Sequence, residues 1–247
     1  MTMLQACLNG GRTRAEAPGV PLTPKELARD AVAAREAGAQ ELHVHPRNLA
    51  ESETLAPAEV GAALKAIRAA VPGMPVGIGT GAWIAPGGTK RLAQMEAWEE
   101  LPDYVSVNMN EADAPKVISL MHERGIGVEA GVWSVADAKR LCREVPKTSI
   151  LRVLVEMPDA SGPIVRTEAA RCIEMLRSRG MQAPILLHGL EQSAWPCVIE
   201  AARLGLSTRI GFEDVLDLPG GTPAPSNAAL VACARDLIDH TTRDVTG

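Results

Sequence analysis

Two histidines that stand two residues apart give the sequence its first chemical signal. His43 and His45 lie in the largely apolar stretch 40–45, QELHVH. If this stretch is a β-strand, the alternation of side chains directs both imidazoles to one face, where they supply half of a divalent metal site. The alternative is a pair of partly exposed histidines satisfied by hydrogen bonds. Because the chain has only 5 histidines, their pairing at one strand end favours metal ligands.

A group of charged residues occurs near the C-terminus, in the segment 207–214, STRIGFED. On a strand, Arg209 and Glu213 share a face, and Asp214 begins the following loop. Charged side chains are rarely buried unpaired, so one interpretation is a salt bridge at the rim. In the functional interpretation Glu213 joins the two histidines as a third ligand, which leaves one position open as in catalytic zinc sites. Arg209 would then bind a substrate carboxylate, and Asp214 would act as a general base.

Several other predicted strands also end in polar residues. Each of these residues alone could be a helix cap or a turn residue, and His188 is better explained as a hydrogen-bonded residue than as a further ligand. Together they predict a polar pocket. We expect Thr80, Gly81, Ser106 and Asn108, from the third and fourth strands, to bind substrate. The polar residues are Thr80, Gly81, Ser106, Asn108, Asn110, Glu129, Glu156 and His188.

The hydrophobic pattern predicts a scaffold that brings these distant segments together. Short apolar runs alternate with helical patterns, the first of which opens with a capping box at Thr23 and Glu26. Strands that alternate with helices of this length imply right-handed crossovers and a parallel sheet. The predicted strands are 3–8, 40–45, 75–79, 103–108, 126–132, 150–156, 184–189 and 207–212. The predicted helices are 24–37, 57–71, 89–100, 112–124, 134–144, 164–179, 192–204 and 226–239.

Eight strand–helix units favour one closed (β/α)8 TIM barrel over an open doubly wound sheet. A dinucleotide-binding sheet is disfavoured because Gly10 and Gly11 lead to Arg12 and form no G-x-G-x-x-G motif. No linker or change of composition divides the sequence, so we expect residues 1–247 to form a single domain. The active site of such a barrel lies at the C-terminal ends of the strands, where the residues above fall.

The composition excludes several other classes of protein. The 247 residues include 25 Lys+Arg and 30 Asp+Glu, for a net charge of −5, and 46% are hydrophobic. This hydrophobic content is enough for a full core, while the lack of a basic cluster and the small number of aromatic residues argue against nucleic-acid binding. No segment has the pattern of a membrane span or a signal peptide. The 5 scattered cysteines suit a reducing compartment, so we expect a cytoplasmic protein.

These residues and their surroundings resemble those of the β-keto acid cleavage enzymes, typified by 3-keto-5-aminohexanoate cleavage enzyme. H-x-H-x-R at 43–47 and R-x-G-x-E-D at 209–214 occur in the order and on the strands found in that family. The similarity extends over nearly the whole chain. The matching segments are 22–48, 77–83, 103–110, 127–133, 209–216 and 223–231.

The resemblance implies a zinc-dependent (β/α)8 barrel with acetyl-CoA as its co-substrate. Such an enzyme transfers the acyl part of a β-keto acid to coenzyme A and releases acetoacetate. We also expect a homo-oligomer. The implied ligands of one zinc per chain are His43, His45 and Glu213, and the implied catalytic residues are Asp214, Arg209 and Glu129.

The sequence departs from the family pattern near the expected substrate. After the third strand it reads GTGA at 79–82, where the family usually shows Ser-Thr-Gly-Gly, so one hydroxyl that could contact substrate is missing. An acidic position of the first strand is replaced near Arg12, and the motif H-x-H-x-R-D ends in Asn48. These departures concern the substrate and leave the metal set intact.

Three other functions share parts of this pattern. A divalent-metal aldolase or lyase would use the same ligands, with Asp214 as base, to cleave a small keto or hydroxy acid without CoA. An amidohydrolase-type barrel also contains H-x-H but needs further histidines, of which only His188 is available. A barrel that only binds a small acid would show no turnover with metal present. Metal analysis and assays with acetyl-CoA discriminate among these functions.

Overall fold

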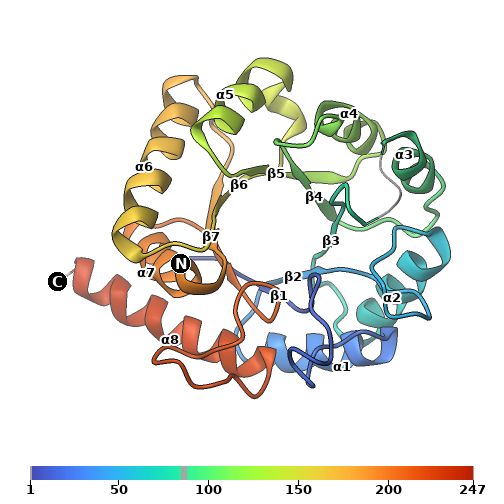
Figure 1. Cartoon of the computed structure of the whole chain (residues 1–247), viewed down its shortest axis with the longest axis horizontal. Helices are drawn as coiled ribbons and strands as arrows, with labels where there is room; N and C mark the ends of the chain where they lie inside the picture. Colours follow the sequence, from blue (N-terminus) through green and yellow to red (C-terminus); the bar gives the residue numbers. More distant parts are fainter. Residues whose placement is uncertain (1, 85–87, 247) are drawn as a thin grey trace.

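The computed structural model of the chain describes residues 2–84 and 88–246, which form a ring of parallel strands covered by helices (Figure 1). The predicted (β/α)8 barrel is therefore confirmed. Its strands are β1 (Leu4–Cys7), β2 (Glu41–Val44), β3 (Val76–Gly79), β4 (Tyr104–Asn108), β5 (Gly127–Val132), β6 (Arg152–Met157), β7 (Ile185–Gly189) and β8 (Thr208–Ile210). Its α-helices are α1 (Pro24–Glu36), α2 (Pro57–Ala70), α3 (Gly88–Glu96), α4 (Ala114–Glu123), α5 (Val135–Glu144), α6 (Gly162–Ser178), α7 (Ala194–Leu204) and α8 (Asn227–Thr246).

Helix α1 begins with the capping box that the sequence predicts. The Thr23 hydroxyl accepts a hydrogen bond from the Glu26 backbone N–H at 3.2 Å, and the Glu26 carboxylate accepts one from the Thr23 N–H at 2.9 Å. Pro24 occupies the first turn, and Leu27, Ala31 and Ala34 are buried at helical spacing. The helix stops before Gly38, whose φ of +108° favours glycine.

The sheet has the order β7-β6-β5-β4-β3-β2-β1-β8, and every ladder in it is parallel. Strands β7 and β8 close the ring through one bridge between Leu186 and Ser207, supported by the Thr208 hydroxyl on the Leu187 carbonyl at 2.8 Å. Alternation along β2 places Leu42 and Val44 in the hydrophobic core, which leaves the histidines for the interior of the ring.

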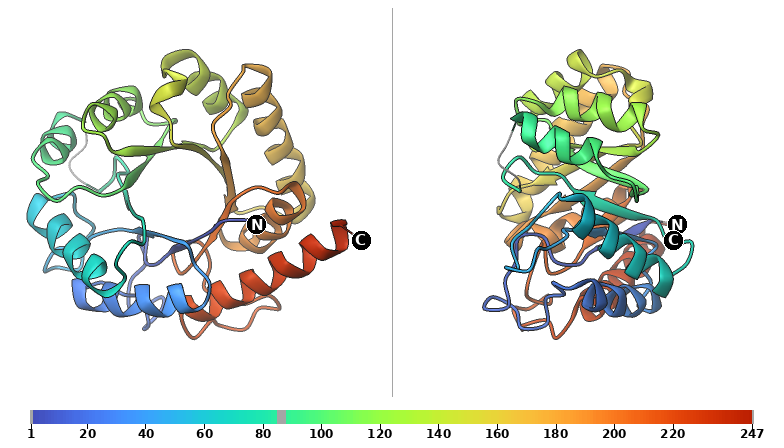
Figure 2. Two further views of the ribbon diagram at one scale, coloured as in Figure 1. Left: turned by 180° about the vertical axis from the view of Figure 1, so that it is seen from behind. Right: turned by 90° about the vertical axis from the view of Figure 1, so that its right-hand side faces the viewer.

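Both ends of the described chain lie on the same side of the barrel (Figure 2). The chain enters β1 from this side, so the C-terminal ends of the strands open on the opposite side. None of the helices that the structure describes is both long and apolar enough to cross a membrane.

Two predicted boundaries differ from the structure near the C-terminus. Strand β8 ends at Ile210 instead of residue 212, because the Asp214 and Val215 N–H groups donate to the Gly211 carbonyl at 2.9 and 3.0 Å and form a turn. Helix α8 continues to Thr246 instead of residue 239. The polar residues past 239 extend this helix, with the Thr242 hydroxyl bonded to the Ile238 carbonyl at 2.7 Å.

Candidate active site

Three side chains from β2 and the turn after β8 converge at the mouth of the barrel. The Nε2 atoms of His43 and His45 lie 3.1 Å apart. The Glu213 carboxylate oxygens lie 3.6 Å from the His43 Nε2 and 3.7 Å from the His45 Nε2. Ligand atoms bound tetrahedrally to zinc are separated by about 3.3 Å. The arrangement therefore fits one divalent metal ion held by the three predicted ligands.

The chemistry of these donor atoms also fits a cation. The Glu213 Oε2 is buried and has no hydrogen-bond partner in the part of the chain that the structure describes. Burial lowers the pKa of His43 to about 3, so its ring is neutral, as metal binding requires. The neutral His43 imidazole and a carboxylate oxygen of Glu213 thus present lone pairs to one point, beside the Nε2 of His45.

A carboxylate outside this set orients one of the ligands. The Glu53 Oε1 lies 2.5 Å from the His45 Nδ1, and the Glu53 Oε2 accepts a hydrogen bond from the Trp83 indole at 3.1 Å. A carboxylate behind a ligating histidine fixes the ring and increases its basicity. Sequence reasoning missed Glu53, because only the folding of the loop after β2, with its Arg47–Glu53 bridge, brings it back to His45.

Two glycines give the ligands the space that they occupy. A Cβ atom at Gly79 would lie 2.1 Å from the His45 Nε2. At Gly10, which has a φ of +49°, a Cβ atom would lie 2.3 Å from the Glu213 Cγ. Any side chain at either position would displace a ligand.

Arg209 is hydrogen-bonded to both carboxylates of the turn. Its Nη2 donates to the Glu213 Oε1 at 2.9 Å and to the Asp214 Oδ1 at 2.8 Å. The Asp214 Oδ2 accepts a hydrogen bond from the Cys7 thiol at 2.8 Å. The turn, rather than the predicted strand alternation, brings both carboxylates to the guanidinium.

The charges of this group shift the pKa of each carboxyl downward. Burial raises the pKa of Glu213, but Arg209 and the histidines outweigh burial and lower it to about 2. Burial likewise raises the pKa of Asp214, and Arg209 and His188 outweigh it, so this pKa lies well below its usual value. Both side chains are therefore carboxylates at neutral pH.

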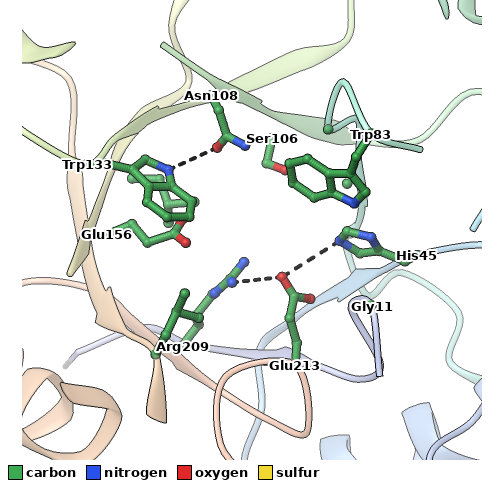
Figure 3. Close-up of a pocket in the computed structure, with 13 residues that line it drawn as sticks. Gly11, His45, Trp83, Ser106, Asn108, Trp133, Glu156, Arg209 and Glu213 are labelled. Carbon is green, nitrogen blue, oxygen red and sulfur yellow. Dashed lines mark hydrogen bonds and ion pairs between the residues drawn. The ribbon is translucent and has the colours of Figure 1, made fainter. Parts of the chain in front are cut away.

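A pocket of about 190 Å³ opens above this group (Figure 3). Its size is below the range of about 300–1,000 Å³ for drug-sized ligands and suits a small acid. Three of the predicted substrate-binding residues, Gly81, Ser106 and Asn108, line it. Sequence reasoning missed two indoles in its walls, because Trp83 and Trp133 lie just beyond strand ends. The lining residues are Gly11, His45, Gly79, Gly81, Trp83, Ser106, Asn108, Trp133, Leu154, Glu156, Leu190, Arg209 and Glu213.

The remaining predicted site residues lie outside this lining. The Thr80 hydroxyl donates to the Ser106 carbonyl at 2.6 Å, so it supports the third and fourth strands. Asp214 is fully buried behind Arg209. Glu129 is also fully buried and lies 2.7 Å from the Arg152 Nε. For these three residues, direct roles in binding or catalysis stay predictions.

His188 and Glu156 form a further pair on β7 and β6. The His188 Nδ1 accepts a hydrogen bond from the Arg209 Nε at 3.2 Å, and its Nε2 lies 3.3 Å from the Glu156 Oε2. Burial and Arg209 lower the pKa of His188, but Glu156 and Asp214 raise it further, so the pKa is raised overall. The hydrogen bond from the Arg209 N–H nevertheless requires an unprotonated Nδ1, so in this arrangement the His188 ring carries its proton on Nε2.

The fold is a (β/α)8 barrel with a candidate metal site at its mouth, and the sequence assigns the family. Residues 2–247 match the family described as beta-keto acid cleavage enzyme. The chain belongs to this family, which confirms the resemblance stated above.

Two curated relatives cover most of the chain. It is 24% identical to a 3-keto-5-aminohexanoate cleavage enzyme of Fusobacterium nucleatum, over 89% of this chain and 84% of the relative. It is 25% identical to a 3-oxoadipate:acetyl-CoA acetyltransferase of Cupriavidus necator, over 92% of this chain and 84% of the relative.

Solved structures support the fold alone, because their identities are low. ObcA in a binary complex with oxaloacetate superposes with a TM-score of 0.68 at 16% identity, over 89% of this chain. The chain spans 63% of the length of ObcA. A type I 3-dehydroquinate dehydratase from Clostridium difficile superposes with a TM-score of 0.63 at 10% identity, over 98% of this chain and 93% of the other.

Proposed function

We propose that this protein is a zinc-dependent enzyme that cleaves a β-keto acid with acetyl-CoA, yielding an acyl-CoA and acetoacetate. The observation that carries the proposal is the convergence of His43, His45 and Glu213 beside Arg209 at one small pocket. Family membership and the activities named for the two relatives support the acyl transfer. When bound, the metal would act as a Lewis acid on a substrate carbonyl.

Arg209 is the residue that we assign to the substrate carboxylate. It lines the pocket, and its Nη1 makes no hydrogen bond to any described residue. Its other nitrogens are fixed by Glu213, Asp214 and His188, so the guanidinium is held in place before substrate arrives. A guanidinium fixed in this way binds a carboxylate with little further loss of side-chain freedom.

Asp214 is our proposed proton acceptor for the carbon next to the keto group. It stays ionised because of Arg209, but it lies behind that side chain. Contact with substrate therefore requires the Asp214 side chain to turn toward the pocket while Arg209 keeps its place. Gly81, Ser106 and Asn108 would meet the remaining substrate oxygens from the third and fourth strands.

The cellular setting belongs to the same proposal. The cysteines Cys7, Cys142, Cys172, Cys197 and Cys233 are free thiols, which supports a reducing compartment such as the cytoplasm. Small acids and acetyl-CoA are the proposed partners, and the homo-oligomer stays a prediction.

Metal analysis combined with a substrate panel tests this function. The purified protein should contain about one zinc per chain and should release acetoacetate from β-keto acids only when acetyl-CoA is present. His43→Ala should lose both the metal and the activity while keeping the far-ultraviolet circular dichroism of the barrel. Cleavage without acetyl-CoA would instead identify a metal-dependent lyase, and binding without turnover would identify a small-acid-binding barrel.

A further inference from the structure

We propose that His188 is a positioning residue, which fixes the plane of the Arg209 guanidinium so that its Nη1 faces the carboxylate of the substrate. This inference rests on the proposed function, because that function assigns the substrate carboxylate to Arg209. His188 is fully buried behind the pocket lining, so it acts through Arg209 and not by contact with substrate.

The contacts of Arg209 show why it needs a partner besides the two carboxylates. Its side chain points into the pocket, with Glu213 on one side and Glu156 on the other (Figure 3). Its Nη2 donates both to Glu213, at 2.9 Å, and to Asp214, at 2.8 Å. Two hydrogen bonds at one nitrogen let the guanidinium swing about that nitrogen. The Nε donates to the His188 Nδ1 at 3.2 Å, and a second fixed nitrogen sets the orientation of the planar group.

His188 is also the partner that keeps its place during the proposed reaction. Glu213 is a proposed metal ligand, so a bound metal would compete for its lone pairs. Asp214, as the proposed base, must turn toward the pocket, and this movement breaks its hydrogen bond to the Arg209 Nη2. His188 comes from β7 and takes part in neither step. It therefore holds the guanidinium while both carboxylates are engaged elsewhere.

The surroundings of His188 make its Nδ1 a hydrogen-bond acceptor. Glu156 on β6 is its partner in the ladder between the two strands, and the Glu156 Oε2 lies 3.3 Å from the His188 Nε2. A carboxylate at this nitrogen favours the tautomer with the proton on Nε2, which leaves the lone pair of Nδ1 for Arg209. Both ring nitrogens are thus engaged by protein groups, which explains why His188 is not among the candidate metal ligands.

Binding of acetoacetate and of its uncharged amide tests this role without turnover. Acetoacetate is itself a β-keto acid, and acetoacetamide replaces its carboxylate by a neutral group of the same shape. Calorimetry of the zinc-loaded enzyme without acetyl-CoA gives the ratio of the two affinities, which measures the contribution of the carboxylate. General damage to the pocket would lower both affinities and keep the ratio, whereas a misdirected guanidinium would lower the ratio.

Two amide substitutions separate the roles of the two ring nitrogens. The side-chain oxygen of an asparagine can take the place of Nδ1, whereas a glutamine places its amide at Nε2, beside Glu156. His188→Asn should therefore keep most of the ratio. His188→Gln should lower it about tenfold to hundredfold, as expected when a hydrogen bond to a charged group is lost. His122→Gln, the same substitution at an exposed position of α4, should leave the ratio unchanged.

An unchanged ratio in His188→Gln would overturn the inference. Equal losses in His188→Asn and His188→Gln would also overturn it, since the ring would then be needed for packing and not as an acceptor at Nδ1. Equal affinities of the wild type for acetoacetate and its amide would contradict both the assignment of Arg209 to the carboxylate and the role of His188. If the ratios change as expected but no β-keto acid yields an acyl-CoA with acetyl-CoA, the role of His188 is supported and the acyl transfer alone is contradicted.

Discussion

Arg209 and Arg152 each lie between two carboxylates, yet only Arg209 reaches the pocket. Arg209 donates to Glu213 and Asp214 from the turn after β8. Arg152 pairs with Glu129 at 2.7 Å and also with Glu41, and its guanidinium lies 5.1 Å from the centre of the Tyr104 ring. The groups have the same chemistry but different surroundings.

The difference lies in where the carboxylates stand along the chain. The partners of Arg209 follow a strand, whereas Glu129 and Glu41 are inside β5 and β2. Glu129 is also hydrogen-bonded to Gln5 at 2.9 Å, so the second group is closed by protein atoms. A charged cluster in a barrel therefore indicates a site only where it includes residues beyond the strand ends, at the mouth. We therefore expect the first group to support chemistry and the second to support the fold.

The variant Asp214→Asn should have the largest effect on activity. An amide keeps the shape of the side chain but cannot accept a proton, so kcat should fall about 10²-fold to 10⁴-fold. Zinc content and keto-acid binding should be retained, which elemental analysis and calorimetry measure. Turnover at the wild-type rate would show that Asp214 is not the base, and Glu129 would become the next candidate.

Matched lysine substitutions in the two groups sharpen the contrast. Arg209→Lys should raise KM about tenfold, because an ammonium cannot reproduce the fork of a guanidinium. Arg152→Lys should leave kcat/KM per folded molecule unchanged and lower the free energy of unfolding by about 1–3 kcal/mol. Steady-state kinetics and urea denaturation of both variants check this pair. Equal kinetic losses would remove the distinction between the groups.

The smallest expected effect is a change in pH dependence from Glu129→Gln. Burial raises the pKa of Glu129 above its usual value of 4.5, against the attraction of Arg152. A carboxyl with a raised pKa in the folded state contributes stability below pH 4.5, and this contribution is lost as the pH rises through the raised pKa. The stability of the wild type relative to Glu129→Gln should therefore decline with pH in that window. A flat difference in urea midpoints from pH 4 to 8 would contradict it.

The sequence was sufficient to predict most of the fold and the convergence of the three candidate metal ligands. Periodicity located all eight strands, since each buried strand is short and apolar and each helix has its own start and stop residues. His43 and His45 were found because a spacing of two is local information. Glu213 was found for a partly wrong reason, since a turn and not strand alternation brings it to Arg209.

Residues that depend on loop folding could not be found in this way. Glu53 reaches His45 only because its loop turns back. Trp83 and Trp133 follow strand ends, where the period of two no longer applies. Glu129 shows the converse limit: alternation predicts that a strand residue faces inward, but it does not show whether protein or substrate surrounds it.

The closure of the ring between β7 and β8 has a consequence for motion. Every other neighbouring pair forms a ladder, whereas these strands share one bridge at Leu186 and Ser207. Side chains add to this join, since Thr208 bonds to the Leu187 carbonyl and Arg209 to His188. Local opening has its lowest free energy where the fewest hydrogen bonds must break. We therefore expect local opening at this join, between the wall that carries Glu156 and the half of the barrel that carries His43, His45 and Glu213. The amide hydrogens of Leu187 and Ser207 should exchange with solvent earlier than those in the middle of the ladders.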